Sequence, residues 1–209
     1  MNSKNLQAIL QASSSQHSHL CPRQILGARL GLAGLSALKF DEPPIQKRLL
    51  VVAECDGCFV DGLIAATGCT FGHRTLRVVD WGKTAATFID TKIGQAIRVA
   101  PALDIRERAH AYVPNESRHY LAQLLAYQVM PDDKMFSVTS VSLNGSLEAI
   151  ISRPGMRVAC DVCGEEIMNE REIKKDGLDL CSACAGESYY SVLPTFAHAI
   201  SFVLKESPV

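Results

Sequence analysis

The sequence lacks a long hydrophobic run, although 47% of its 209 residues are apolar and can build a packed core. The longest late uncharged stretch, "SVLPTFAHAISFVL", contains Pro194 and His198 and is too short to span a bilayer. The start of the chain has one lysine in a broken apolar stretch, which does not match a secretory signal. These absences predict a cytoplasmic protein with no membrane segment.

The sequence also lacks an excess of either charge, with a formal net charge of −1 and a pI of about 6.6. No general attraction to nucleic acid or to an anionic membrane is therefore expected. Eight cysteines are present, and in a reducing cytoplasm they indicate metal or thiol chemistry rather than a disulfide framework.

The apolar patterning predicts a mixed α/β core followed by a small cysteine-bearing module. Short β-branched and apolar runs predict five strands, within residues 47–54, 75–81, 85–91, 95–101 and 135–143. Helical patterns cover residues 4–12, 23–38, 58–67 and 116–129. The composition changes near Arg153, which predicts a core domain of residues 1–153 and a zinc-finger domain with a tail, 154–209. The tail contains a further helical pattern at 196–206.

The helical stretch over 23–38 contains three glycines, Gly27, Gly31 and Gly34. They lower its helix propensity but allow a neighbouring element to pack closely. Pro22 suits the first turn of that helix, and Gly68 suits the end of the helix over 58–67. The helix over 116–129 is predicted to be amphipathic, and its apolar side includes Leu121, Leu124, Leu125 and Val129.

The four C-terminal cysteines have a specific spacing. Cys160 and Cys163 form one CxxC pair, and Cys181 and Cys184 form a second after seventeen intervening residues. Four thiolates at this spacing match tetrahedral Zn²⁺, and four protein ligands close the site, which predicts a structural zinc rather than a catalytic one. The intervening segment is too short for a core of its own, so metal binding is expected to supply much of its folding free energy.

This module is acidic. Residues 154–187 contain eight acidic residues against four basic ones, and such a surface repels phosphates. The module is therefore predicted to contact a protein partner rather than nucleic acid.

The N-terminal stretch "HSHLCP" carries His17, His19 and Cys21 at alternate positions. In an extended segment these side chains share one side, and imidazole with thiolate suits zinc and other borderline transition metals. Two surface histidines and a buried cysteine are the alternative interpretation.

Cys58 follows a strand and begins a helix, where the helix N-terminus is expected to stabilise the thiolate and lower the cysteine pKa. Asp61, in the first turn, suits capping, metal ligation or general-base catalysis. Cys55 and Cys58 also resemble a thioredoxin-type redox pair, and Cys69 in the turn after the helix offers a second thiol partner for Cys58.

These motifs together resemble the FmdE-like family, which takes its name from a component of formylmethanofuran dehydrogenase. The resemblance rests on "HSHLCP", "CFVDGL", "TGCTFG", "DWGKTAATF" and the C-terminal "RVACDVCGE" and "LCSACAGE". It implies an α+β fold: a thioredoxin-like core with a mixed β-sheet flanked by helices, and an appended treble-clef zinc finger.

The resemblance also implies a metal-binding site in the core. His19, Cys21 and Cys58 match the motif positions best and are the predicted ligands. His17, Asp61 and Cys69 match neighbouring positions, with His17 the added metal candidate.

Two further positions in these motifs are candidates for binding or chemistry. Lys83 matches a turn lysine that suits an anionic cofactor group. His73 departs from the usual lysine or asparagine and offers a nitrogen near the site. Together with Cys58 and Asp61, His73 completes the predicted catalytic set.

Three functions remain open from the sequence, and whether the protein is an enzyme is among the open questions. The first is a metal-binding accessory protein that supports a molybdenum or tungsten formylmethanofuran or related dehydrogenase. It would hold a structural Zn²⁺ and a second Zn²⁺ or other transition metal in the core. The second is a zinc-dependent enzyme that uses an open metal position on a small substrate. The third is a thiol redox or sulfur-carrier protein using Cys55, Cys58 and Cys69. A homodimer is also expected.

Overall fold

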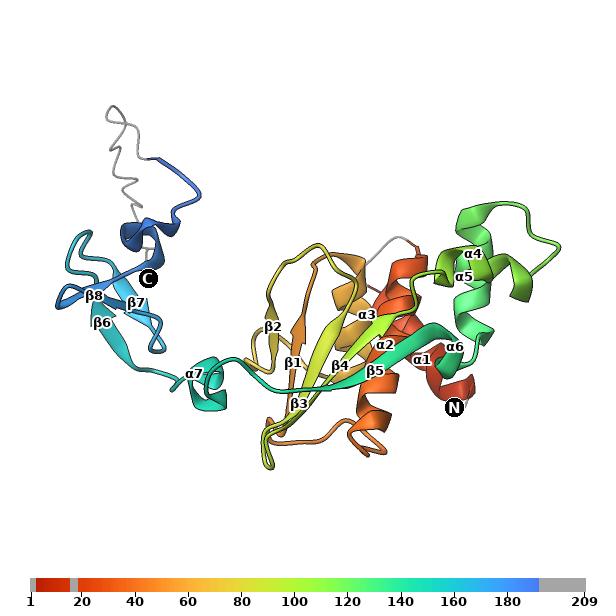
Figure 1. Ribbon diagram of the computed structural model, residues 1–209, viewed down its shortest axis with the longest axis horizontal. Helices are drawn as coiled ribbons and strands as arrows, with labels where there is room; N and C mark the ends of the chain where they lie inside the picture. Colours follow the sequence, from red (N-terminus) through yellow and green to blue (C-terminus); the bar gives the residue numbers. More distant parts are fainter. Residues whose placement is uncertain (1–2, 16–18, 192–209) are drawn as a thin grey trace, which may run out of the picture. The chain divides into compact units, whose positions relative to one another are not determined.

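The computed structural model describes residues 3–15 and 19–191, and the chain divides into two compact units, Met1–Leu147 and Glu148–Val209 (Figure 1). Each unit is considered by itself. The domain boundary expected after Arg153 stays a prediction. His17 and the helix expected at 196–206 lie outside the described residues.

The first unit is built on a five-stranded mixed sheet in the order β2-β1-β3-β4-β5. Strands β1 and β2 pair in parallel, and the remaining neighbours are antiparallel. The five strands are β1 (Leu49–Ala53), β2 (Leu76–Val78), β3 (Ala86–Asp90), β4 (Gln95–Pro101) and β5 (Phe136–Val141). All five fall inside the predicted stretches, so the α+β class with a mixed sheet and flanking helices is confirmed.

Six helices are described within the first unit (Figure 1). They are α1 (Ser3–Ser14), α2 (Pro22–Ala37), α3 (Cys58–Thr67), α4 (Ile105–Tyr112), α5 (His119–Val129) and α6 (Asp132–Met135). The sequence patterns predicted α1, α2, α3 and α5 but missed α4 and the four-residue α6. Helix α4 buries only Ile105 and Ala109 and so shows little apolar periodicity. As expected, Pro22 begins α2, and Gly68 ends α3 with a left-handed φ of 67°.

Helix α3 connects the parallel strands β1 and β2, because parallel neighbours need a crossover connection. The N-terminus of α3 therefore lies at the carboxyl end of β1. Open sheets of this kind bind ligands outside the carboxyl ends of parallel strands. The fold thus places Cys58 at a favoured position for a functional site.

Helices α2 and α3 run parallel and touch through their backbones. A Cβ atom at Gly27 would overlap the carbonyl oxygen of Phe59, and one at Gly62 would overlap the carbonyl oxygen of Gln24. Further along, Gly31 faces Ala66 on α3. The expected close packing of the α2 glycines is confirmed, and their partners lie within the chain. These glycines therefore serve contacts inside one molecule, and the homodimer stays a prediction.

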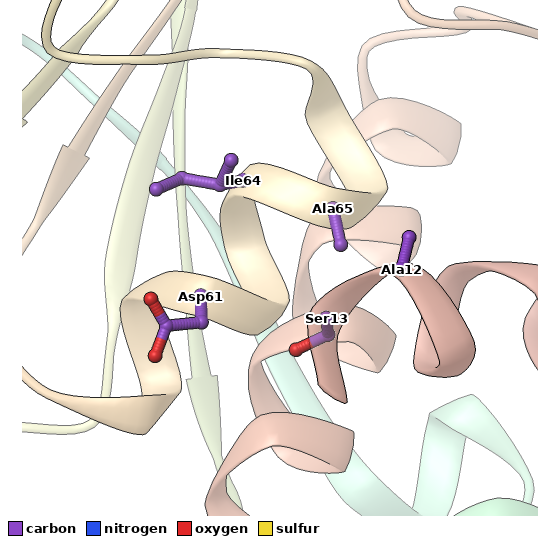
Figure 2. A pocket seen from close by; sticks show the side chains of 5 residues that line it. All are labelled: Ala12, Ser13, Asp61, Ile64 and Ala65. Atoms are coloured by element: carbon purple, nitrogen blue, oxygen red, sulfur yellow. The ribbon is translucent and has the colours of Figure 1, made fainter. Parts of the chain in front are cut away.

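Helix α1 packs against α2 and α3. Figure 2 shows Ala12 and Ser13 of α1 opposite Asp61, Ile64 and Ala65 of α3. Small residues on both helices leave a cavity between them.

Helix α5 buries a different face from the one expected. Its buried side chains are Ala122, Ala126 and Tyr127, whereas Leu125 and Val129 are 44% and 64% exposed. The prediction that the large apolar residues face the core is wrong for these two. The small alanines allow α5 to pack closely, and tertiary packing outweighs side-chain hydrophobicity here.

The described part of the second unit, up to residue 191, contains two β-hairpins and a short helical turn. Strands β6 (Arg157–Ala159) and β7 (Glu166–Met168) form one hairpin, and β8 (Ile173–Lys175) and β9 (Leu178–Leu180) form the other. Helix α7 (Leu147–Ile151) precedes them, and the turn η1 (Ala183–Glu187) follows.

A helix that crosses a bilayer needs about 20 mostly apolar residues. Among the described residues, no helix is long and apolar enough to cross a membrane.

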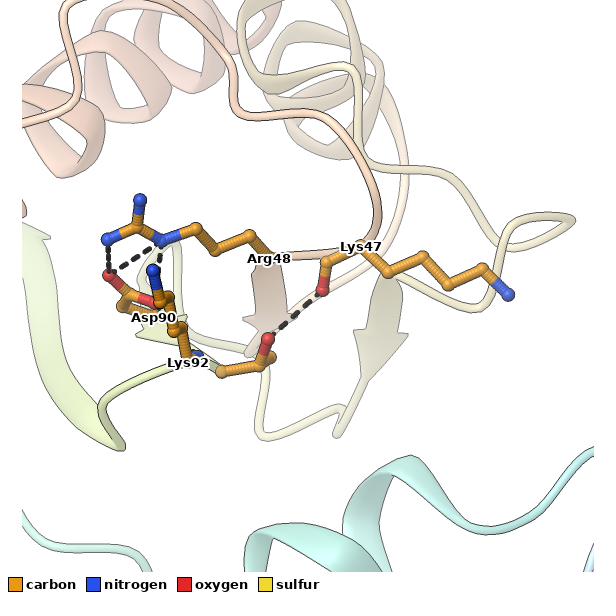
Figure 3. Close-up of polar contacts among 5 residues, drawn as sticks. Lys47, Arg48, Asp90 and Lys92 are labelled. Carbon is orange, nitrogen blue, oxygen red and sulfur yellow. Dashed lines mark hydrogen bonds and ion pairs between the residues drawn. The ribbon is translucent and has the colours of Figure 1, made fainter.

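A buried carboxylate, that of Asp90, lies at the end of β3, the middle strand of the sheet (Figure 3). Asp90 is 1% exposed, and its oxygens accept hydrogen bonds from Nε of Arg48 at 3.0 Å and from Nη2 at 2.6 Å. The backbone N–H of Lys92 donates to the same carboxylate at 2.9 Å. The Arg48 hydrogen bond is the main cause that holds the pKa of Asp90 below its ordinary value.

The Asp90→Asn substitution tests this contact through its pH dependence. Because the folded-state pKa is lowered, the contact stabilises the protein above the unfolded pKa of about 3.9. That stabilisation is lost as the pH falls through the folded pKa. Urea unfolding should show the variant less stable than the wild type at pH 7, with the difference shrinking below about pH 4. Asp133→Asn, at an exposed acid in α6, should show no such trend, and an equal trend would contradict the assignment.

Candidate functional site

Cys21 occupies the N-cap of α2 and is held there by a reciprocal pair of hydrogen bonds. The backbone N–H of Gln24 donates to Cys21 Sγ at 3.4 Å, and Gln24 Oε1 accepts from the Cys21 N–H at 2.8 Å. This is a capping box with a thiol in place of the usual hydroxyl. The sulfur is thereby fixed at the helix N-terminus.

Cys58 is the first residue of α3 and follows Gly57, which has a φ of 74°. Because α2 and α3 run parallel and touch at Gly27 and Gly62, the thiols of Cys21 and Cys58 interact. Burial, followed by the Cys21 thiol, raises the pKa of Cys58, while a backbone hydrogen bond opposes the rise. The expected lowering of this pKa is therefore wrong, because desolvation and a second sulfur outweigh the helix N-terminus.

Asp61 and His19 lie near this thiol pair in the chain. Asp61 is half-buried in the first turn of α3, and its charge adds to the rise in the Cys58 pKa. His19 is exposed and stands two residues before Cys21. A third helix N-terminus contributes Tyr120, in the first turn of α5, where burial and then the charges of Cys21 and Cys58 raise the phenol pKa.

Tyr120 was missed from the sequence. The helix that carries it was predicted, but nothing in the local pattern indicates that its N-terminus meets those of α2 and α3. Tyr120 is 49% exposed, and the charges of Cys21 and Cys58 act on its phenol.

Cys55 has a separate environment. It is 4% exposed, and Nη2 of Arg23 lies 3.9 Å from its Sγ. Burial raises its pKa, and Arg23 opposes the rise. The thiol that acts on Cys58 is thus Cys21, from the preceding helix, rather than Cys55 of the CxxC sequence.

The loop that carries Lys83 is anchored at the same end of the sheet. The backbone N–H groups of Trp81 and Lys83 donate to the carbonyl oxygen of Glu54 at 2.9 and 3.1 Å. The buried Glu54 carboxylate accepts from Arg98 at 2.6 and 2.7 Å. Lys83 Nζ lies 5.5 Å from the centre of the exposed Trp81 ring, so the loop presents an aromatic face and a cation together.

Cys69 and His73 lie at the opposite end of α3. From the helical rise, the ten-residue helix separates Cys58 from Cys69 by on the order of 15 Å. Cys69 Sγ donates to the Leu49 carbonyl at 3.5 Å, and burial raises its pKa. Cys69 and His73 line another cavity, of about 350 Å³. The structure therefore does not bring these two residues together with Cys58.

The four C-terminal cysteines converge. One ligand atom from each of the four lies within 4.8 Å of all the others, and Cys163 Sγ is 3.9 Å from Cys181 Sγ. A tetrahedron with metal–sulfur distances of about 2.3 Å has sulfurs about 3.8 Å apart. These four thiols therefore suit a closed tetrahedral metal site, as the spacing predicts.

Backbone N–H groups favour the ionised form of one cysteine in this cluster. The N–H of Cys181 donates to Cys160 Sγ at 3.4 Å, and backbone N–H groups, those of Cys163 and Cys181 foremost, lower the pKa of Cys160 to about 6. The neighbouring thiols, led by Cys181, raise the pKa of Cys184 to about 12. Four neighbouring thiols cannot all ionise together unless a positive charge lies between them. A bound metal ion supplies that charge.

The fold and the cysteine geometry define a mixed α+β domain with a four-cysteine metal-binding unit appended. The sequence pattern that describes FmdE, from the molybdenum formylmethanofuran dehydrogenase operon, matches residues 16–137. The chain belongs to the FmdE family.

Two comparisons extend this assignment. A crystal structure of a tungsten formylmethanofuran dehydrogenase FmdE-like protein from Syntrophus aciditrophicus superposes with a TM-score of 0.59 at 19% identity. The match covers 89% of this chain and 95% of that one, and it supports the fold. A "probable S-adenosyl-L-methionine-binding protein" from Archaeoglobus fulgidus is 28% identical over 211 residues. That match covers 90% of this chain but 55% of the relative, so the chain spans about half of the relative's length.

The Gly27→Ala substitution tests the helix contact that joins the two thiols. The new methyl group would overlap the Phe59 backbone, and overpacking of this kind costs about 1–3 kcal/mol. Urea unfolding should show that loss. Gly72→Ala is the matched control, because a Cβ atom at Gly72 would have no neighbouring atom within 4 Å. Equal stability of the two variants would contradict the close contact.

Metal removal tests the C-terminal unit. Its described core holds only Cys160, Ile167 and Leu180, too little to fold without a metal. A strong chelator should collapse the NMR dispersion of residues 157–187 while signals from the sheet of the first unit persist. Dispersed signals for both units after the metal is shown to be gone would contradict this expectation.

Proposed function

We propose that this chain is a metal-binding accessory protein with a core site formed by Cys21, Cys58 and His19, and with His17 as a fourth candidate ligand. The observation that carries the proposal is the pair of thiols at the N-termini of two parallel helices in contact. Helix N-termini favour thiolates, yet burial and mutual repulsion raise the pKa of Cys58. A cation between the sulfurs would relieve both penalties.

The donor set suits Zn²⁺ or another borderline transition metal. If Cys21, Cys58 and His19 are the only protein ligands, such an ion would keep an open position, where it would act as a Lewis acid. Around it, Gln24 fixes the Cys21 sulfur, and Tyr120 lies close enough for the charges of both thiols to act on its phenol. Asp61 supplies a carboxylate that can hold a proton beside Cys58.

The second unit is proposed to bind a structural Zn²⁺ and to contact a protein partner. Its excess of acidic over basic residues favours a basic protein surface over nucleic acid. In keeping with the family description, the proposed partner is a molybdenum or tungsten formylmethanofuran dehydrogenase or a related enzyme. Lys83, beside Trp81, is proposed to bind an anionic group of a cofactor.

A second candidate function is a zinc-dependent enzyme, and one observation favours it. Asp61, the proposed general base, lines a cavity between α1 and α3 and lies one helical turn from Cys58. A base beside an open metal position is the arrangement required to activate a bound water. His73, at the far end of α3, has no place in this site.

Metal analysis of protein purified without oxygen tests the core site. Wild-type protein is expected to carry about two metal ions per chain, one for each proposed site. Cys58→Ser should carry about one, because only the four-cysteine site keeps its ligands. Cys69→Ser and Cys55→Ser are matched controls that remove other buried thiols and should keep both ions.

Retention of both ions by Cys58→Ser, with the fold intact, would remove Cys58 from the ligand set. A wild-type protein with an empty core and a reversible disulfide between Cys21 and Cys58 would instead favour the thiol redox function.

A further inference from the structure

Helices α4 and α5 pack against each other, and a pair of histidines joins them beside the loop that connects them. Nε2 of His110, in the last turn of α4, lies 2.9 Å from Nδ1 of His119, the first residue of α5. The two rings meet edge to face, with their planes at 82°. His119 is exposed and His110 is half-buried, so the pair is open to solvent. The proposed function uses neither residue.

The hydrogen bonds of the pair fix which ring nitrogens carry a proton. Nδ1 of His110 lies 3.1 Å from the carbonyl oxygen of Glu116. That oxygen only accepts, so Nδ1 of the neutral His110 ring is protonated and donates to it. Nε2 of His110 then has a lone pair and accepts from the Nδ1–H of His119. A histidine that ligates a metal usually donates its other ring N–H to a backbone carbonyl or a carboxylate. His110 therefore has the arrangement of a metal ligand, with Nε2 as the coordinating atom.

The loop between the helices holds the two rings in place. The backbone N–H of Val113 donates to the carbonyl oxygen of His110 at 3.2 Å, and that of Glu116 donates to the carbonyl oxygen of Val113 at 3.0 Å. The backbone N–H and the Nε of Arg118 both donate to the Glu116 carboxylate at 2.9 Å. Ligands that are already held in position lose little conformational freedom when they bind.

The charged groups of this loop are compatible with a bound cation. Nη2 of Arg118 donates to the second carboxylate oxygen of Glu116 at 2.9 Å. The hydrogen bonds from Arg118 and, to a smaller extent, the charge of His110 lower the pKa of Glu116 to about 2. The carboxylate is therefore ionised at neutral pH, and Arg118 leaves no uncompensated positive charge beside the histidines.

The distance between the two nitrogens also suits chelation of a metal ion. With metal–nitrogen bonds of about 2.0–2.1 Å, two nitrogens at right angles about the metal lie about 2.9 Å apart, and tetrahedral positions need about 3.3 Å. The observed distance is 2.9 Å. Right angles between nitrogen ligands are typical of Ni²⁺ and Cu²⁺. After rotation of the rings, such an ion can replace the proton between the nitrogens, and that proton moves to Nε2 of His119.

We propose that His110 Nε2 and His119 Nδ1 chelate a divalent transition-metal ion of the Ni²⁺ or Cu²⁺ type at the junction of α4 and α5. The described residues bring no third histidine, cysteine or carboxylate into a ligand group with the pair, so water completes the coordination. A two-ligand site open to water exchanges its ion more readily than a closed four-cysteine site. The pair is thus a site of reversible metal uptake, and its ion is additional to the two expected in the purified protein.

Titration of the full-length protein with Ni²⁺, with its resident metals in place, tests the site. Paramagnetic Ni²⁺ should broaden the backbone NMR signals of His110 and His119 before any others. Desalting should restore these signals, because the ion exchanges. Broadening that begins at the cysteines or elsewhere, or that survives desalting, would overturn the proposal.

Single substitutions separate a chelate from a hydrogen-bonded pair without metal affinity. His119→Gln changes an exposed residue and should keep the melting temperature of the wild type. It should bind Ni²⁺ at least about ten-fold more weakly, and His110→Gln should do the same, because each removes one ligand. His73→Gln, at an exposed histidine outside the pair, should leave the affinity unchanged. Unchanged affinity in His119→Gln would overturn the site. A loss in His119→Gln without one in folded His110→Gln would leave a single-histidine contact and overturn the chelate.

Discussion

The backbone contact between α2 and α3 is the constraint on which the first unit depends. Gly27 and Gly62 have no side chain, so the two helices meet at a distance that any Cβ atom would prevent. The contact fixes the helices in parallel and sets their N-termini side by side. Two cysteines far apart in the sequence, Cys21 and Cys58, thus become neighbours.

The thiol pair is held between opposing electrostatic effects. Helix N-termini and backbone N–H groups favour thiolates, whereas burial and a second sulfur disfavour them. For Cys58 the second pair of effects prevails, and its pKa rises. In the C-terminal cluster the hydrogen bonds prevail at Cys160 and the neighbouring sulfurs prevail at Cys184. The four C-terminal sulfurs therefore suit a bound cation.

The eight cysteines therefore serve different purposes. Four converge in the second unit, and Cys21 and Cys58 pair in the first. Cys55, beside Arg23, and Cys69, at the far end of α3, stand apart as buried thiols. The CxxC spacing of Cys55 and Cys58 does not by itself make them an interacting pair of thiols. Gly57 lies between them with a positive φ, and Cys55 contacts Arg23 whereas Cys58 interacts with Cys21.

The sequence by itself determined the features that depend on neighbouring residues. The five strands follow from runs of apolar residues, the start of α2 from Pro22, the end of α3 from Gly68, and the C-terminal cluster from two CxxC turns. Each depends on backbone preferences or on ligands within a few residues, which the local sequence encodes.

Only the tertiary structure decided which distant residues meet. It brought the phenol of Tyr120 within reach of the charges of both thiols and left Leu125 and Val129 of α5 exposed. It also buried the Ser13 hydroxyl without a hydrogen-bond partner among the described residues. These outcomes depend on how closely two helices approach each other and on which of their ends lie together. A contact between helices that are distant in the sequence leaves no periodic signal in either segment.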